Sequence, residues 1–270
     1  MPTFDTPQPI SATVEITAGA IRLVASDRDD TTVDVRPRDE SRSADVKAAE
    51  QVRVHFSNGT LTVTSQRGFS FPRRGAVVVD IILPSGSRLN ASAVSANITA
   101  DGRYADCRFA SVSGGLEIGS VVGNLKLDNV SGEIAVQDIK GAASMTTVSG
   151  DAIIGDLDGD VKFQAASGAL AVTRLHGSVN AQTASGDVTV AAAVNGGVSV
   201  QTASGEVVVG VAEGTAAKLD LRSRSGEVRN TLTAADGPAD GDETLVVHAR
   251  TASGDVVVQR ALQAGPVTTS

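Results

Sequence analysis

The sequence is poor in aromatic residues and cysteine, and it lacks long apolar runs. Its 270 residues include six Phe, one Tyr and no Trp, so Val, Ile, Leu and Ala must fill any core. The single Cys107 excludes an internal disulfide and a cysteine metal cluster. No run approaches the roughly 18 apolar residues of a membrane-spanning helix, and the start, MPTFDTP, lacks signal-peptide regions. Taken as given, the sequence predicts no membrane span and a cytoplasmic protein, with a cell-surface role left open.

Negative charge is concentrated in the later part of the chain. Residues 1–90 contain 11 basic and 11 acidic residues, whereas residues 91–270 contain 12 and 20, which accounts for the net charge of −8. Binding to nucleic acid independently of sequence requires cations facing phosphates. The charge therefore predicts that nucleic acid is not a partner.

A ladder of Ser-Gly pairs dominates the second half of the sequence. The intervals between successive glycines are 18 residues four times, then 19, 21 and 28. A fixed period of this kind indicates stacked repeats, because one 18-residue unit cannot bury its own apolar face. Segment 93–100 is a degenerate ninth copy, with Ala96 in place of glycine. The glycines of the eight complete copies are Gly114, Gly132, Gly150, Gly168, Gly186, Gly205, Gly226 and Gly254.

A second glycine divides each repeat into halves of nine residues. Alternation of apolar and polar residues follows both glycines, which is the pattern of a half-buried strand. The sequence therefore predicts an all-β, single-stranded β-solenoid (β-helix) with 18-residue coils built of two nine-residue halves. We expect two principal sheets, and a third short side if Leu157, Leu175 and Ala193 point inward. The dividing glycines are Gly123, Gly141, Gly159 and Gly177.

The pattern predicts three parts of the chain. Residues 1–90 keep the alternation without the period and are expected to be degenerate coils that cap the stack. Residues 91–258 are the regular repeats, and residues 259–270 are a C-terminal tail. Loops are expected at 37–50, 66–75 and 233–243, where the pattern breaks.

The alternation also predicts which side chains are inside. Thr183 and Ser185 continue the inward parity of Val179 and Ala181, so we expect their hydroxyls to form hydrogen bonds inside the stack. The following residues are expected in the core: Val161, Phe163, Leu170, Val172, Val188, Val190, Val207 and Val209.

Acidic residues follow most of the Ser-Gly pairs and raise the question of calcium. Calcium-binding loop motifs are absent, and Asp or Glu beside glycine is common in solvated turns. We therefore predict no metal site and no cofactor. The acidic residues are Glu133, Asp151, Asp187, Glu206, Glu227 and Asp255.

Catalytic signals are weak. His55, His176 and His248 are far apart in sequence, and no nucleophile-elbow, zinc-protease, phosphate-loop or C-x-x-C motif occurs. Cys107 is expected to point inward and to be inert. The basic loop Arg67–Arg74, with Phe69 and Phe71, is the one patch of mixed character, and a loop without a partner is the simpler interpretation. We assign no catalytic residue.

The repeats carry a resemblance to a known family. The recurrent V-x-[ST]-x-S-G-[DE]-[VI]-x-V, preceded by Ile81–Leu89 (IILPSGSRL), resembles the bacterial putative-adhesin family of unknown function over roughly residues 10–258. The resemblance implies a β-solenoid without established catalytic residues.

Three classes of function remain open from the residues. A non-catalytic scaffold or protein-binding module is favoured, with a protein partner or self-association through the C-terminal coil, Thr251–Val258, which is expected to leave the end of the stack open. The alternatives are a carbohydrate-active β-helix enzyme, which usually needs aromatic platforms that this chain lacks, and a cation-dependent adhesive surface. A hexapeptide acyltransferase would require a sub-period of six, and the observed one is nine.

Overall fold

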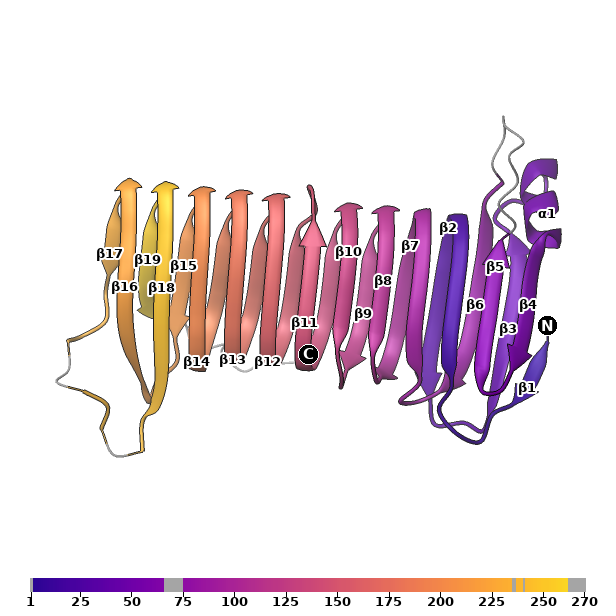
Figure 1. The fold of residues 1–270 in the computed structure, drawn as a ribbon, viewed down its shortest axis with the longest axis horizontal. Helices are drawn as coiled ribbons and strands as arrows, with labels where there is room; N and C mark the ends of the chain where they lie inside the picture. The colour runs from indigo at the N-terminus through magenta and orange to yellow at the C-terminus, as the bar shows by residue number, and fades with distance from the viewer. Residues whose placement is uncertain (1, 66–74, 235–236, 240, 262–270) are drawn as a thin grey trace, which may run out of the picture. The chain divides into compact units, whose positions relative to one another are not determined.

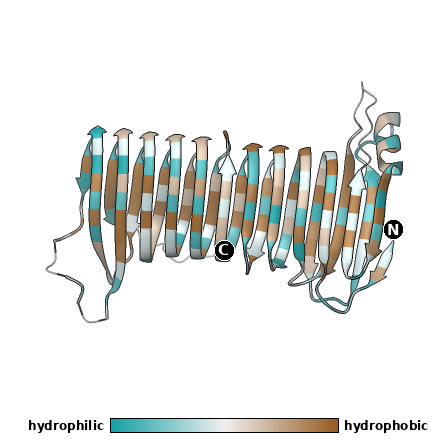
Figure 2. Cartoon of the chain, viewed as in Figure 1, coloured by the Kyte–Doolittle hydropathy of each residue, from teal (hydrophilic) through white to brown (hydrophobic). Residues whose placement is uncertain are grey.

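The computed structural model describes residues 2–65, 75–234, 237–239 and 241–261, and it is almost entirely β-structure (Figure 1). The chain forms two compact units, residues 1–151 and 152–270. In each, strands of successive coils pair in parallel, so the predicted β-solenoid is confirmed. Apolar and polar residues alternate along the strands, as the brown and teal bands of Figure 2 show.

The described residues of the first unit form one helix and eleven strands. They are β1 (Thr3–Asp5), β2 (Ser11–Ser26), β3 (Asp30–Pro37), α1 (Ser43–Glu50), β4 (Val52–Ser57), β5 (Thr60–Ser65), β6 (Val77–Pro84), β7 (Arg88–Tyr104), β8 (Cys107–Ser113), β9 (Leu116–Val121), β10 (Leu125–Ser131) and β11 (Ile134–Thr147). The expected loop at 37–50 is therefore partly wrong, because the helix-favouring segment SADVKAAE forms α1.

The second unit contains the remaining strands. They are β12 (Ala152–Ser167), β13 (Leu170–Ser185), β14 (Val188–Ser204), β15 (Val207–Val211), β16 (Thr215–Ser225), β17 (Val228–Asn230), β18 (Glu243–Ser253) and β19 (Val256–Arg260). Described residues between β17 and β18 form no strand, as predicted for the loop at 233–243.

The 18-residue period of the sequence equals the separation between residues that pair on neighbouring strands. In the first unit Cys107 lies beside Leu125 and Leu125 beside Ala143, each 18 residues further on. In the second unit Val161 lies beside Val179 at the same spacing. The 19-residue interval has a local cause, because the β13–β14 register shifts between Leu175 and His176 and inserts one residue.

The final coils are not stacked in sequence order. Strand β18 pairs on one side with β14 and on the other with β16, while β19 lies between β15 and β17. The coil of residues 243–260 is therefore internal, and the coil of residues 215–230 is terminal. The expectation that the coil of Thr251–Val258 lies at the open end is wrong, because β18 and β19 insert between the coil of β14 and β15 and the coil of β16 and β17.

The first unit has a similar inserted strand. Strand β2 lies between β7 on one side and β5 and β6 on the other, and all these pairs are parallel. Antiparallel pairing then takes over, with β3 on β6, β1 on β3, and β4 on β5. The rings of Phe4 and Phe56, with centroids 5.1 Å apart, connect β1 and β4.

Glycine at the coil corners is required by close stacking. Gly177 has φ +126°, and a Cβ there would lie 2.1 Å from the carbonyl oxygen of Gly159 in the preceding coil. A Cβ at Gly186 would likewise lie 2.1 Å from the carbonyl oxygen of Gly168, although Gly186 does not have a left-handed φ. The two glycine ladders thus let neighbouring backbones approach at strand spacing.

The predicted core is confirmed. The eight predicted residues are at most 2% exposed, and Phe163 is fully buried. The side chains expected to form a third short side also point inward, since Leu157, Leu175 and Ala193 have no exposed surface. Cys107 is buried as predicted.

Candidate functional site

The acidic residues that follow the Ser-Gly pairs are part of the turns. The Asp187 carboxylate accepts a 2.8 Å hydrogen bond from the backbone N–H of Glu206, and Asp255 accepts one of 2.9 Å from Glu227. Each carboxylate thus binds a backbone amide of the neighbouring coil. Within the described residues, no group of three or more His, Cys, Asp and Glu side chains is placed to hold a metal ion.

The hydroxyl ladder beneath the Ser-Gly turns differs from the expectation. Thr183 is buried, but Ser185 is exposed, because the alternation ends in the last two residues of β13, where Ala184 and Ser185 are both exposed. The Thr183 and Thr202 hydroxyls have no hydrogen-bond partner among the described residues. The expectation that these inward hydroxyls are satisfied is therefore wrong at these two positions.

The three histidines lie on different strands. His55 is on β4, His176 on β13 and His248 on β18. The Nδ1 of His248 lies 3.6 Å from an Asp220 carboxylate oxygen, and His176 pairs in register with Asp158 of β12. The basic loop with Phe69 and Phe71 lies within residues 66–74, outside the described residues.

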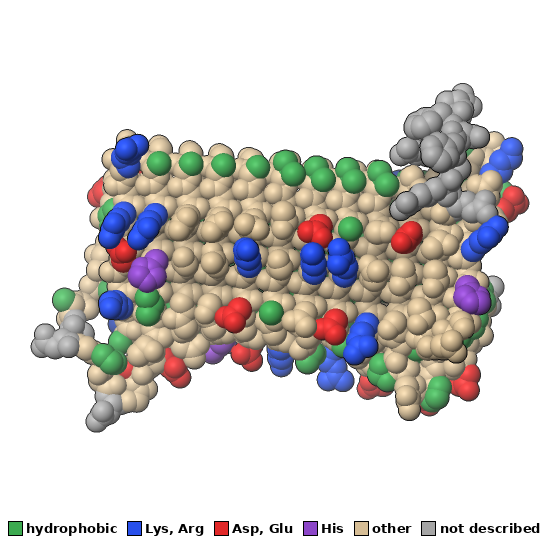
Figure 3. Space-filling view, viewed as in Figure 1, with side chains coloured by type: hydrophobic (Ala, Val, Ile, Leu, Met, Phe, Trp, Pro, Cys, Tyr) green, Lys and Arg blue, Asp and Glu red, His purple; other side chains and the backbone are tan. Residues whose placement is uncertain are grey.

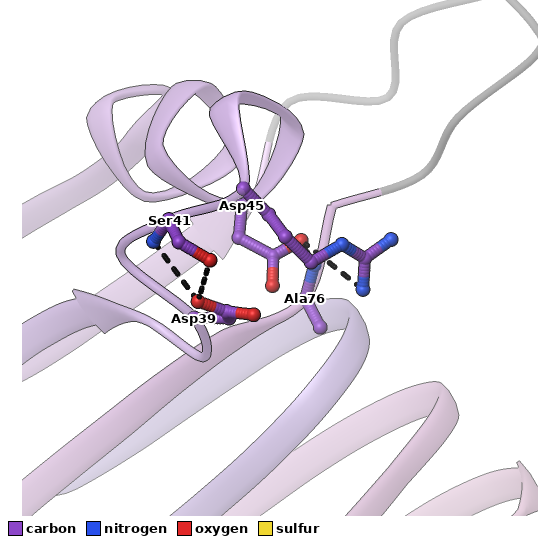
Figure 4. Close-up of polar contacts among 5 residues, drawn as sticks. Asp39, Ser41, Asp45 and Ala76 are labelled. Carbon is purple, nitrogen blue, oxygen red and sulfur yellow. Dashed lines mark hydrogen bonds and ion pairs between the residues drawn. The ribbon is translucent and has the colours of Figure 1, made fainter.

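A buried carboxylate fixes α1 to the sheet (Figure 4). Asp45 has no exposed surface, and its Oδ1 accepts a hydrogen bond from the backbone N–H of Ala76 at 3.1 Å. Arg42 lies 4.0 Å from the same oxygen. Nearby, Asp39 accepts hydrogen bonds from the hydroxyl and backbone N–H of Ser41, and these bonds lower the pKa of Asp39. These contacts order the segment before β4 and are structural.

An exposed row of valines runs along the first unit. We call Val94, Val112, Val130 and Val148 the valine stripe; they are 41–52% exposed. The residues flanking them pair from coil to coil, for example Ser113 with Ser131, so the valines stack one per strand spacing. A row of apolar side chains of this kind is visible along one edge in Figure 3. Sequence reasoning missed the stripe, although the recurrent Val before Ser-Gly signals it.

A shallow groove of about 400 Å³ adjoins the stripe. Its walls include Val94, Val112 and Val130 from the stripe, together with Ile16 of β2 and Asp128 of β10. The groove is thus lined by both apolar and polar side chains, a mixture that protein-binding surfaces also have.

Basic side chains gather at the end of the second unit, over β16 and β18 (Figure 3). Asp220 of β16 is the acidic centre of this group, with its carboxylate 3.0 Å from Arg222 and 3.7 Å from Arg250. Partial burial opposes ionisation of Asp220, but Arg222 first, then Arg250 and His248, lower its pKa below the ordinary value. The carboxylate is therefore ionised at neutral pH and offsets part of the positive charge.

Comparison with solved structures finds bacterial proteins that align with most of this chain at low identity. A putative adhesin from Bacteroides fragilis is 12% identical, with 95% of each chain covered and a TM-score of 0.46. A putative lipid binding protein from Parabacteroides distasonis is 14% identical, with 97% of this chain and 96% of that chain covered and a TM-score of 0.40. A putative cell adhesion protein from Clostridium sporogenes is 7% identical, covering 96% and 98%, with a TM-score of 0.22. These names describe adhesion or lipid binding and none describes an enzyme.

A search of curated proteins finds no significant match. Among the described residues, no helix has the length and apolar character needed to cross a membrane. The Toastrack DUF4097 family model matches residues 11–260, which includes the parallel coils of both units. The serial Ser-Gly coils and this match together show that the chain belongs to the Toastrack DUF4097 family.

Proposed function

We propose that the chain is a non-catalytic binding module that docks a protein partner along the valine stripe. The observation that carries the proposal is the exposure of four valines in consecutive coils beside a groove. Contiguous exposed apolar side chains rimmed by polar ones are typical of interaction sites. At about 4.8 Å per coil, the stripe extends about 14 Å, enough for a short segment of a partner.

The fold itself does not require valine at these positions. Of the five equivalent residues of the second unit, four are alanines and one is Arg224, yet its coils stack with the same register. Each valine of the stripe leaves about half of its side chain in water, which is apolar surface that alanine would not present. A binding role supplies a reason for that surface. The four alanines are Ala166, Ala184, Ala203 and Ala252.

We further infer that residues 1–90 serve as the cap of the first unit. The change from parallel to antiparallel pairing at β3 and β4 and the contact between Phe4 and Phe56 support this role. Antiparallel hairpin strands end a parallel stack because they do not continue its coil.

The binding proposal is tested by site-specific photo-crosslinking in the organism that encodes the protein. A photoreactive residue at Val112 or Val130 is expected to capture one defined protein, and its mass distinguishes a second copy from another chain. Ala184, which has the same place in its coil, is the matched control. Equal crosslinking yields from Val112 and Ala184 would contradict the proposal.

A further inference from the structure

The terminal coil of the second unit presents an unpartnered sheet edge. Strand β16 pairs with β18 on one side, and no strand in the described part of the chain pairs with its other side. Strand β17 has the same relation to β19. This edge is a consequence of the inserted coil, which takes the internal place and leaves residues 215–230 outermost. A row of unpaired backbone groups is a template for strand addition.

The apolar side chains of this coil are incompletely covered. Leu219 and Leu221 of β16 are half-buried, whereas Val247, which pairs with Leu219, has no exposed surface. Val228 of β17 is 43% exposed, and its partner Val256 is fully buried. An added strand would therefore bury aliphatic surface as well as satisfy backbone groups.

The outer face of the edge is basic, although the whole chain is acidic. Residues 215–225 contain three cationic side chains, Lys218, Arg222 and Arg224, and one carboxylate, Asp220. Arg222 and Arg250 hold that carboxylate, and both are more than half exposed. A second copy of β16 would bring the same net charge of +2 to the edge, so the charge disfavours self-pairing and favours an acidic partner.

We propose that β16 accepts an extended segment of a partner protein in which acidic and aliphatic residues alternate. Side chains of an added strand alternate between the two faces of the sheet. On the outer face, Asp or Glu would lie beside Lys218, Arg222 and Arg224, at cross-strand distances of about 4.5–5.5 Å. On the inner face, aliphatic side chains would cover Leu219 and Leu221. This site is separate from the valine stripe and does not depend on it.

The proposal is tested with synthetic peptides and the full chain. The probe is a fluorescent peptide of alternating glutamate and valine, and binding is measured by anisotropy. Two control peptides are used: one in which lysine replaces glutamate, and one that has the same composition arranged in two blocks. We expect only the alternating acidic peptide to bind, with affinity that falls as salt rises.

Matched charge variants test whether the peptide binds at the edge of β16. The R222E/R224E variant should raise the Kd about tenfold or more, whereas K140E/K162E, with the same change in charge on exposed residues elsewhere, should leave it within about twofold. Circular dichroism checks that each variant is folded, and R222Q/R224Q replaces the reversal if that variant fails. Hydrogen exchange should show protection of backbone amides within 216–224 when the peptide binds.

Three results would overturn the proposal. The first is that no peptide binds, and the second is that the two double variants weaken binding equally. The third is a dimer in light scattering that R222E/R224E disrupts, because a second copy would then occupy the edge.

Discussion

The Thr215 hydroxyl donates a 2.7 Å hydrogen bond to the carbonyl oxygen of Val194, whereas the buried hydroxyl of Thr183 has no partner among the described residues. Replacing threonine by valine keeps the shape of the side chain and removes only the hydroxyl. Thr183→Val should therefore raise the free energy of unfolding by about 1 kcal/mol, since a buried unsatisfied group costs about 1–3 kcal/mol. Thr215→Val should lower it by about 1 kcal/mol. Urea unfolding of both variants checks the pair, and equal losses would contradict the assignment.

Glycine substitutions should separate close stacking from backbone strain. Gly177 and Gly214 both have a left-handed φ, but a Cβ at Gly214 would meet nothing within 4 Å. Gly214→Ala should cost about 1–2 kcal/mol, from strain alone. Gly177→Ala adds the collision with the Gly159 carbonyl and should cost at least about 3 kcal/mol. Denaturant midpoints measure both, and similar losses would show that the coils are not held at this distance.

Phe163 should be a strong determinant of stability in the second unit. Its ring has no exposed surface, so Phe163→Ala should lower the free energy of unfolding by about 3–5 kcal/mol. The neighbouring Lys162 is exposed, and Lys162→Ala should change it by less than about 0.5 kcal/mol. A loss below about 1 kcal/mol for Phe163→Ala would indicate a strand register one residue away.

Alkaline pH should destabilise the first unit. Burial, and then the charge of Asp106, raise the pKa of Cys107 from 9.0 to about 12. Burial, followed by Cys107 and Asp101, also raises the pKa of Tyr104 above its ordinary value of 10.0. Below the pKa values that the two groups have in the unfolded chain, both are neutral and their contribution to stability is complete. This contribution is lost as the pH rises from those values through the higher pKa values of the folded state.

The free energy of unfolding should therefore fall between about pH 9 and 12, by up to about 1.4 kcal/mol per pH unit for each group. In the Cys107→Val variant, the decrease in the free energy of unfolding that begins near pH 9 should be absent. The decrease that Tyr104 causes above pH 10 should remain. Urea titrations at pH 8, 9 and 10 compare the two proteins, and parallel curves would contradict burial of the thiol.

The sequence was sufficient for the register and the core, because both follow from local periods. Spacings of 18 placed Val161 beside Val179, and alternation placed Phe163 inside. Sequence could not reveal which coils are neighbours at the end of the second unit. Intervals of 21 and 28 residues fit an ordinary stack with longer loops, whereas Gly254 in fact lies between Gly205 and Gly226. Pairing order depends on non-local contacts that a period does not encode.

The candidate surfaces were less predictable for a different reason. Strict alternation assigned Ser185 to the inside, but alternation fails at the end of β13, where Ala184 and Ser185 are both exposed. Val112 is exposed as alternation requires, since it follows the inward-facing Ser111 of β8. The unpaired edge of β16 depends on the order of the coils, so an error in that order assigns the unpaired edge to the wrong coil.

The inserted coil has a consequence for biosynthesis. A ribosome completes residues 215–230 before residues 243–260, yet in the second unit the later segment separates the earlier one from β14 and β15. The earlier coil therefore has no native strand neighbour until the later segment has emerged. Growth of this unit cannot proceed one coil at a time along the nascent chain. Its last two coils must assemble together, and a chain halted near residue 240 would carry a coil without its native neighbour.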